Sequence, residues 1–225
     1  MFSSLRLNAF HIFIHPTDYD DETTENDIMI IKLQSASSAP ITKLNFNGGT
    51  PQEGQQVRAV GFGATNKEGD AYPEDLRKVV VDVWNHATCS DAYGFVPETT
   101  AFCAGDVNSE KDSCSGDSGG PLFDVSDNTL QYGITSFGGD LCADADYPGV
   151  YTRVSAYESW IKTNVCQLSS DPPSGWCDGD GETTDSPTAS PADGYDDYDD
   201  YDDYDDNKEC KSAGSLFGFR QSKDC

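Results

Sequence analysis

One short segment of the chain carries the residue types and the spacing that acyl transfer by a serine needs. Residues 112–122 read DSCSGDSGGPL, so Ser118 follows Asp117 and precedes two glycines. A serine hydroxyl attacks a carbonyl carbon when a base takes its proton and N–H groups bind the oxyanion that forms. Glycine permits the tight turns that aim backbone N–H groups at the serine oxygen. The segment therefore predicts a nucleophile beside its own oxyanion hole.

A tight turn without any chemistry is the alternative for Gly-Asp-Ser-Gly taken alone. The whole segment is more specific, and it resembles the active-site serine segment of the trypsin/chymotrypsin family of serine proteases. The resemblance extends from about residue 7 to residue 165. It implies a serine endopeptidase without cofactor or metal, acting as a monomer on peptide or protein substrates and open to protein inhibitors. In that scheme Ser118 is the nucleophile, and the N–H groups of Gly116 and Ser118 bind the oxyanion.

The triad aspartate of the family directly precedes an apolar strand, and Asp27 stands there in the similar segment HPTDYDDETTENDIMIIKL. Seen alone, Asp27 fits equally well as a turn residue or a strand-end cap. The family's catalytic histidine lies well before this aspartate, in an Ala-Ala-His-Cys-like context. His11, His15 and His86 lack that context, so we interpret them as surface or structural residues. We expect the chain by itself to be inactive for want of this base.

Specificity follows from the resemblance as well. Asp112 stands six residues before Ser118, where a carboxylate at the base of the primary pocket selects Arg or Lys. The matching pocket residues are Ser113, Gly138 and Gly149, and the residues that pair with an extended substrate are Ser136, Phe137 and Gly138. Asp117 matches the aspartate that binds the amine freed by propeptide cleavage. An Ile-Val-Gly-Gly segment to supply that amine is not found in the sequence.

An all-β architecture is predicted for the elements that must position these residues. Residues 28–33, 55–65, 76–83 and 129–137 read as strands, and residues 147–154 resemble the family's last barrel strand. Residues 154–165 show helical spacing of apolar positions. We therefore expect a trypsin-like double six-stranded β-barrel with an incomplete first barrel, a short terminal helix and a disordered acidic tail. The domains are residues 1–165, a partial protease domain, and residues 166–225, the tail.

Charge and cysteine content limit the partners and the compartment. The formal net charge of −26 argues against nucleic acid, which would be repelled. Eight cysteines without metal-type spacing favour disulfides in an oxidising, extracellular compartment. The first 14 residues do not form a signal peptide, and no segment is long enough to span a membrane, so we interpret the chain as lacking its N-terminal quarter. The family resemblance implies the pairs Cys89–Cys103 and Cys114–Cys142.

The tail repeats Tyr-Asp-Asp four times over residues 195–206. A run of like charge with little apolar surface cannot offset the entropy of ordering, so a solvated spacer is the favoured interpretation. Sulfation of the tyrosines, or binding of a basic partner, remains an alternative. Of three possible connectivities for the tail cysteines we favour Cys166–Cys177 with Cys210–Cys225.

Two hypotheses from different classes fit these observations. The first is an endopeptidase-family member whose sequence lacks its beginning. The second is a secreted non-catalytic homologue that binds or inhibits. A protein freed from catalysis has no chemical need to retain Ser118, Asp27 and Asp112 together, which favours the first hypothesis. A structural acidic protein organised by the tail would explain the tail alone.

Overall fold

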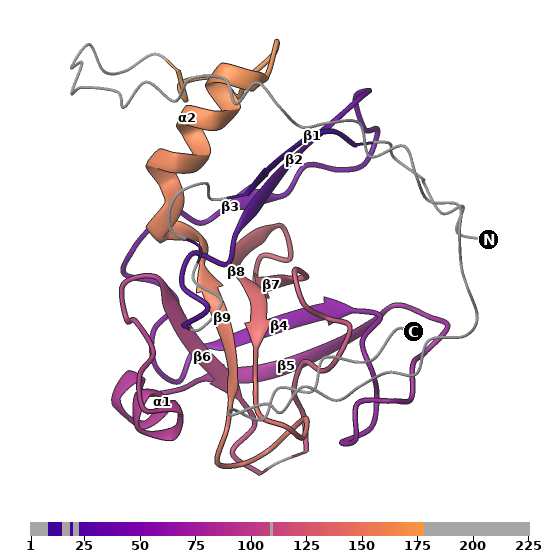
Figure 1. Cartoon of the computed structure of the whole chain (residues 1–225), viewed down its shortest axis with the longest axis vertical. Coiled ribbons are helices and arrows are strands. Elements are labelled where there is room, and N and C mark those ends of the chain that lie inside the picture. Colours follow the sequence, from indigo (N-terminus) through magenta and orange to yellow (C-terminus); the bar gives the residue numbers. More distant parts are fainter. Residues whose placement is uncertain (1–8, 15–18, 20–22, 109, 178–225) are drawn as a thin grey trace, which may run out of the picture. The chain divides into compact units, whose positions relative to one another are not determined.

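Six strands form a closed antiparallel barrel in the computed structural model, which describes residues 9–14, 19, 23–108 and 110–177 (Figure 1). The strands are β4 (Gln56–Gly61), β5 (Arg77–Val83), β6 (Ala101–Gly105), β7 (Pro121–Asp124), β8 (Leu130–Phe137) and β9 (Gly149–Arg153). Around the barrel they run β4, β5, β6, β9, β8, β7, and β7 pairs back with β4. Closure gives every one of these strands two partners, which removes open sheet edges. The short β3 (Lys43–Leu44) adds to β8 in parallel.

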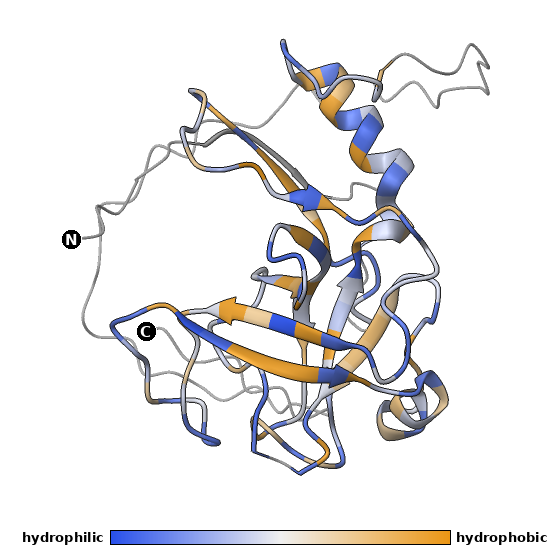
Figure 2. Ribbon diagram, turned by 180° about the vertical axis from the view of Figure 1, so that it is seen from behind, coloured by the Kyte–Doolittle hydropathy of each residue, from blue (hydrophilic) through white to orange (hydrophobic). Residues whose placement is uncertain are grey.

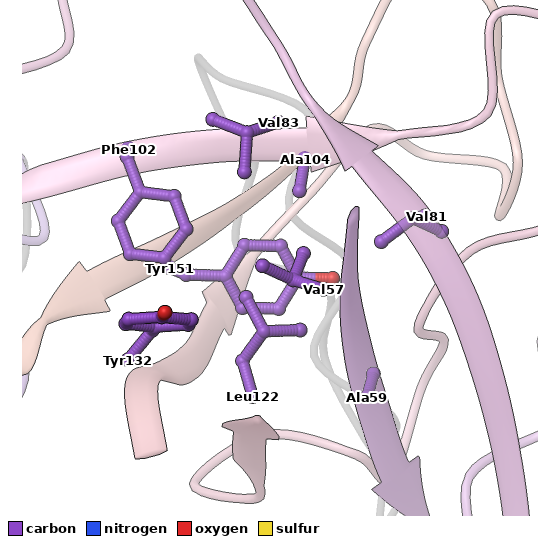
Figure 3. Packing of buried hydrophobic residues seen from close by; sticks show 9 residues of the cluster. All are labelled: Val57, Ala59, Val81, Val83, Phe102, Ala104, Leu122, Tyr132 and Tyr151. Atoms are coloured by element: carbon purple, nitrogen blue, oxygen red, sulfur yellow. The ribbon is translucent and has the colours of Figure 1, made fainter. Parts of the chain in front are cut away.

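The barrel interior is filled by alternate residues of its strands. On β4 and β5 the inward side chains are Val57, Ala59, Val81 and Val83, and the alternation on β4 is visible as a change of colour in Figure 2. Figure 3 shows how the cluster of these and neighbouring buried side chains packs; its further members are Phe102, Ala104, Leu122, Tyr132 and Tyr151. The rings of Phe102 and Tyr151 stack with their centroids 5.8 Å apart. This core fixes the strands from which the site loops emerge.

A second, much smaller sheet precedes the barrel. It consists of β1 (Ala9–Ile14) and β2 (Met29–Leu33), paired antiparallel as a hairpin (Figure 1). On β2 the side chains of Met29 and Ile31 are 51% and 47% exposed. The predicted fold class, a trypsin-like architecture with an incomplete first barrel, is thereby confirmed.

Three helical segments of the described residues flank the barrel, and one of them was not predicted. The sequence patterns predicted no helix near Cys89, whereas the structure has α1 (His86–Tyr93) there. The amphipathic pattern of α1 is weak because Cys89 is its one buried residue. Asn85 caps the helix, since its side chain accepts the N–H groups of Ala87 and Thr88 at 2.9 and 3.3 Å. After β9 come the 3₁₀ segment η1 (Val154–Tyr157) and α2 (Glu158–Leu168), as the helical spacing predicted.

The disulfides Cys89–Cys103 and Cys114–Cys142 are both present. The chain divides into two compact units, Met1–Pro172 and Pro173–Cys225. α2 runs past residue 165, where the sequence suggested a domain boundary. Cys166 and Cys177 are each disulfide-bonded, and their pairing with one another stays a prediction. The Tyr-Asp-Asp repeats and the predicted pair Cys210–Cys225 lie outside the described residues.

Candidate active site

The loop that carries Ser118 turns tightly at two glycines. Gly116 and Gly119 have φ angles of 92° and 75°, which residues with side chains rarely adopt. Within the loop the N–H of Asp117 donates to the Cys114 carbonyl oxygen at 2.9 Å. Ser118 is exposed. Among the described residues no acceptor takes the N–H groups of Gly116 or Ser118, so both are available to a bound oxyanion.

Asp117 is held by the backbone on both of its carboxylate oxygens. The N–H of Gly63 donates to Oδ1 at 2.8 Å, and the N–H of Cys114 donates to Oδ2 at 2.9 Å. A Cβ atom at Gly61 or Gly63 would overlap the Asp117 carboxyl group. The glycines at the end of β4 and just after it therefore leave the space that the Asp117 side chain occupies.

Asp27, two residues before the start of β2, reaches the barrel. The Ser136 hydroxyl donates to Asp27 Oδ2 at 2.6 Å, and the Thr152 hydroxyl donates to the Asp27 carbonyl oxygen at 2.8 Å. The neighbouring Asn26 accepts the Tyr157 hydroxyl at 3.0 Å. Strands β8 and β9 thus hold Asp27 in place, although more than a hundred residues separate it from Ser136 and Thr152 in the sequence. The aspartate is oriented by the barrel and can itself orient a base.

Asp112 lies close to Gly149, which in turn lies close to Gly138, as expected for these three residues. A Cβ atom on Gly149 would lie 3.0 Å from Asp112 Oδ1, and one on Gly138 would lie 3.9 Å from the Gly149 Cα. The Ser113 N–H donates to Asp112 Oδ1 at 2.8 Å, and the Ser113 and Tyr151 hydroxyls are hydrogen-bonded at 2.9 Å. A side chain larger than glycine at position 149 would press on the carboxylate.

The electrostatics of Asp112 suit a cationic ligand. Burial raises the pKa of its carboxyl group to about 7, against the opposing effect of N–H donors from Ser113 and Ala143, and the charge of Asp117 raises it further. Burial, with help from Asp112, also lifts the pKa of the Tyr151 hydroxyl above its usual range. A cation placed beside Asp112 would compensate the buried charge and lower its pKa.

Asp112 and Asp117 also line one cavity of about 280 Å³. The disulfide residues Cys114 and Cys142 form part of its wall, and Lys67 and Arg77 stand among the lining residues. The carboxylates of Asp112 and Asp117 therefore belong to the wall of the same cavity. This proximity is the reason why Asp117 perturbs Asp112.

Of the three histidines, His86 is the one whose side chain belongs to the described part of the chain. His86 opens α1, which packs against β6. His11 lies on β1, whose side chains are not described, and His15 lies outside the described residues. Within the described part of the chain, no histidine hydrogen-bonds to Ser118 or Asp27.

A family model described as Trypsin matches residues 4–161. The chain belongs to the trypsin family. Serine protease 1 of Homo sapiens is 38% identical over 165 residues, which cover 72% of this chain and 65% of that protein. Trypsin Blo t 3 of Blomia tropicalis is 40% identical over 167 residues, 70% of this chain and 61% of that protein. This trypsin-family chain therefore spans less than two thirds of the length of these relatives.

A solved structure supports the same membership. Neuropsin, described as a serine protease expressed in the limbic system of mouse brain, superposes with a TM-score of 0.64 at 31% identity, and the match covers 71% of each chain. The snake Trimeresurus albolabris supplies another relative, alpha-fibrinogenase albofibrase, 37% identical over 156 residues, 68% of this chain and 59% of that protein.

Three contacts in this trypsin-family site come from residues that the sequence did not single out. Tyr151 binds Ser113, Thr152 binds the Asp27 backbone, and the Ala143 N–H donates to Asp112. Tyr151 and Thr152 read as ordinary strand residues, and Ala143 reads as a loop residue. Their roles arise only when β9 and the loop around Cys142 fold back onto the serine loop, so no local pattern could have revealed them.

Proposed function

We propose that the protein is a serine endopeptidase that cleaves after Arg or Lys through an acyl-enzyme. The observation that supports this best is the position of the Asp112 carboxyl group: a Cβ atom on Gly149 would lie 3.0 Å from its Oδ1, and one on Gly138 would lie 3.9 Å from the Gly149 Cα. A long cationic side chain can pass two glycines and pair with the carboxylate, whereas an apolar side chain would leave that charge uncompensated. The proposed pocket residues are Asp112, Ser113, Gly138 and Gly149.

Ser118 is the proposed nucleophile. Its Oγ forms a bond to the scissile carbonyl carbon while a base takes the hydroxyl proton, and the oxyanion accepts the N–H groups of Gly116 and Ser118. The C–N bond then breaks, the amine leaves with the proton from the base, and water hydrolyses the ester. Each oxyanion donor is worth about 3 kcal/mol of transition-state stabilisation.

Asp27 is the proposed residue that orients the base, and residues 136–138 pair with the extended substrate backbone. The hydrogen bond between Ser136 and Asp27 supports both assignments, because one residue on β8 contacts the aspartate at the point where the substrate strand would lie. Peptide pairing along a strand supplies affinity, and the side-chain pocket supplies selectivity.

The base is the part for which no residue is assigned. For the chain as given we therefore propose that turnover is lost, by about 10⁴-fold to 10⁶-fold relative to a complete triad. This same observation favours the second candidate, a non-catalytic homologue that binds peptides or proteins through the Asp112 pocket. A longer transcript with a histidine in the expected context would separate the two.

We also propose that the protein works outside the cell as a monomer, and that protein inhibitors can bind its substrate face. Its disulfides and its membership of a family of proteases support an oxidising compartment. In the described part of the chain, no helix is both long and apolar enough to cross a membrane.

Two measurements on the purified chain test the proposed function. Benzamidine, a planar cation, should bind the wild type, and Asp112→Asn should weaken that binding at least about a hundredfold because it removes the charge partner. Hydrolysis of Arg and Lys esters should be undetectable, and labelling of Ser118 by a fluorophosphonate should be slow. A wild type without affinity for benzamidine would refute the Arg/Lys specificity. A longer form that contains the expected histidine and is still inert would refute the endopeptidase.

A further inference from the structure

The exposed turn after β3 contains an asparagine that two glycines follow. Residues 47–49 read Asn-Gly-Gly, and Asn47 is the one asparagine in the whole sequence with glycine as its next residue. All three residues are exposed. A Cβ atom on Gly48 would meet no heavy atom within 4 Å apart from those of its chain neighbours. The peptide group between Asn47 and Gly48 is therefore unhindered by packing.

The side-chain amide of Asn47 is oriented toward the glycines by a hydrogen bond. The Gly49 N–H donates to Asn47 Oδ1 at 3.0 Å. Such a donor withdraws electrons from the amide carbon Cγ and can stabilise negative charge that develops on Oδ1. Among the described residues no acceptor takes the Gly48 N–H. The Gly48 nitrogen is thus open to deprotonation by solvent, and its attack on the neighbouring Cγ would close a succinimide ring.

Hydrogen bonds hold the backbone of the same turn in place. The Asn47 carbonyl oxygen accepts the Thr50 N–H, the Thr50 hydroxyl and the Asn45 side-chain amide, each at 3.1 Å. The Asn45 side chain is buried, and its Oδ1 accepts the Asn47 N–H at 3.3 Å. Ring closure moves the Gly48 nitrogen toward Cγ, and the Asn47 carbonyl oxygen, which belongs to the same peptide group, turns away from its donors. These hydrogen bonds therefore slow the attack that the open glycines permit.

We propose that Asn47 is a site of self-modification, at which the folded protein loses a side-chain amide to the Gly48 nitrogen. That nitrogen forms a bond to Cγ, the bond between Cγ and Nδ2 breaks, and ammonia leaves with the proton that Gly48 gives up. Water then opens the succinimide. Opening at Cγ leaves an aspartate side chain at position 47, and opening at the backbone carbonyl carbon leaves isoaspartate there. Either product carries one additional negative charge.

The new carboxylate forms near a cation that the fold already holds. Asn45 Nδ2 donates to the carbonyl oxygens of both Asn47 and Thr50, at 3.1 and 3.3 Å, so these two oxygens lie side by side. The Thr50 carbonyl oxygen also accepts Arg153 Nη1 at 3.5 Å. Burial lowers the pKa of Arg153, and a carboxylate nearby favours its charged form. We therefore expect the modified protein to stay folded.

Peptide mapping of the purified chain after incubation at about pH 8.5 tests the site, because the Gly48 nitrogen reacts faster as the pH rises. Exchange of the NH2 group for OH at position 47 should proceed within about a hundredfold of the rate in a synthetic peptide of residues 43–52, the retardation that the hydrogen bonds of the turn can supply. Urea below the unfolding transition should leave this rate unchanged, as expected for a reaction of the folded state. Asn128, exposed in another turn but followed by Thr129, is the internal control and should react at least about tenfold more slowly.

Two variants test the roles of the neighbouring residues. Gly48→Ala should slow the exchange at least about tenfold, because a methyl group hinders the attacking nitrogen, while the fold has room for that methyl group. Thr50→Val should accelerate the exchange about threefold, because one donor to the Asn47 carbonyl oxygen is lost. Circular dichroism of both variants checks that the fold is retained.

Each contrary result has a defined meaning. Exchange at Asn47 that is more than about a hundredfold slower than in the peptide, or as slow as at Asn128, would overturn the inference. A rate that climbs with urea below the transition would assign the reaction to the unfolded chain and not to the turn. A Gly48→Ala variant that reacts like the wild type would exclude the glycine nitrogen as the attacking atom, and an unchanged rate in Thr50→Val would refute control by the turn. None of these outcomes bears on the proposed proteolysis, because the reaction does not involve the candidate active site.

Discussion

The six-stranded barrel and the β1–β2 hairpin both consist of antiparallel strands, but they differ in how many neighbours each strand has and in how far its side chains are buried. Every barrel strand has two neighbours, and its inward side chains, such as Val57 and Leu122, are fully buried. The hairpin is a two-stranded sheet, and half of the surface of Met29 and Ile31 is exposed. An isolated two-stranded sheet is marginally stable in water. The hairpin therefore depends on its attachment to the barrel, and Asp27 is part of that attachment.

The same comparison predicts which parts of the candidate site are rigid. The proposed nucleophile, the proposed oxyanion donors and the Asp112 cluster all belong to loops of the closed barrel, where a disulfide and the core hold them. Asp27 comes from the segment before the hairpin and is secured by hydrogen bonds to β8 and β9. The binding half of the site is thus expected to be more rigid than the half that would orient a base.

The largest expected effect is a difference in the free energy of unfolding between a barrel variant and a hairpin variant. Leu122→Ala, at a fully buried barrel position, should lower the free energy of unfolding by about 3 kcal/mol, because it leaves a cavity. Ile31→Ala, on the half-exposed hairpin strand, should cost less than about 1 kcal/mol. Urea unfolding of both variants measures this difference. Equal losses would mean that the hairpin shares the barrel's core.

The next effect concerns the charge of Asp112, in the loop between β6 and β7. With a pKa of about 7 for Asp112, benzamidine affinity should fall about thirtyfold between pH 8.5 and 5.5, since protonation removes the charge partner. Asp112→Asn should bind weakly with no such pH dependence. A flat wild-type profile would show that the carboxyl group is not buried as described.

The carboxyl group of Asp112 should change the stability of the fold with pH in the opposite direction to most carboxyl groups. Because the folded-state pKa of Asp112 is raised, the folded protein binds more protons than the unfolded chain between about pH 4 and 7. This group therefore destabilises the fold increasingly as the pH rises through that window. Asp112→Asn should consequently be more stable than the wild type at pH 8, and this advantage should vanish near pH 4, as urea unfolding would show.

A smaller and more local effect is expected where the two regions meet. Ser136→Ala removes a charge-assisted hydrogen bond to Asp27 and should lower the local stability of the β1–β2 hairpin by about 2 kcal/mol. Hydrogen exchange of the β2 amides should accelerate accordingly, while the β4 and β5 amides stay protected. Ser126→Ala, an exposed serine in the turn between β7 and β8, is the control. Equal acceleration in the barrel would show that hairpin and barrel unfold together.

The smallest change in stability is expected for Ile31→Lys. The side chain is half exposed, so the free energy of unfolding should stay within about 0.5 kcal/mol of the wild type. Self-association, followed by light scattering, should nevertheless decrease, because a charge now interrupts the exposed apolar face of an open strand. A loss of more than 1 kcal/mol would place Ile31 in a packed core.

Local patterns were enough to predict much of the fold. Strand-like residue composition predicted β4, β5 and β8 to within one residue at the start of each strand, and helical spacing over residues 154–165 predicted η1 and most of α2. Family resemblance supplied the pairing of Cys89 with Cys103 and of Cys114 with Cys142. The helix α1 was missed because it buries a single residue and is set by the cap of Asn85. The two-residue β3 has no pattern long enough to recognise.

The sequence by itself determined which residues could do chemistry: a serine between glycines, an aspartate before it and another aspartate ahead of an apolar strand. Such information lies in neighbours along the chain, because glycine turns and side-chain types act locally. Only the tertiary structure decided that Ser136 binds Asp27, that Gly63 and Cys114 hold Asp117, and that Asp112 is buried enough to raise its pKa to about 7. These facts depend on which strands become neighbours when the barrel closes and on how much water the closed barrel excludes.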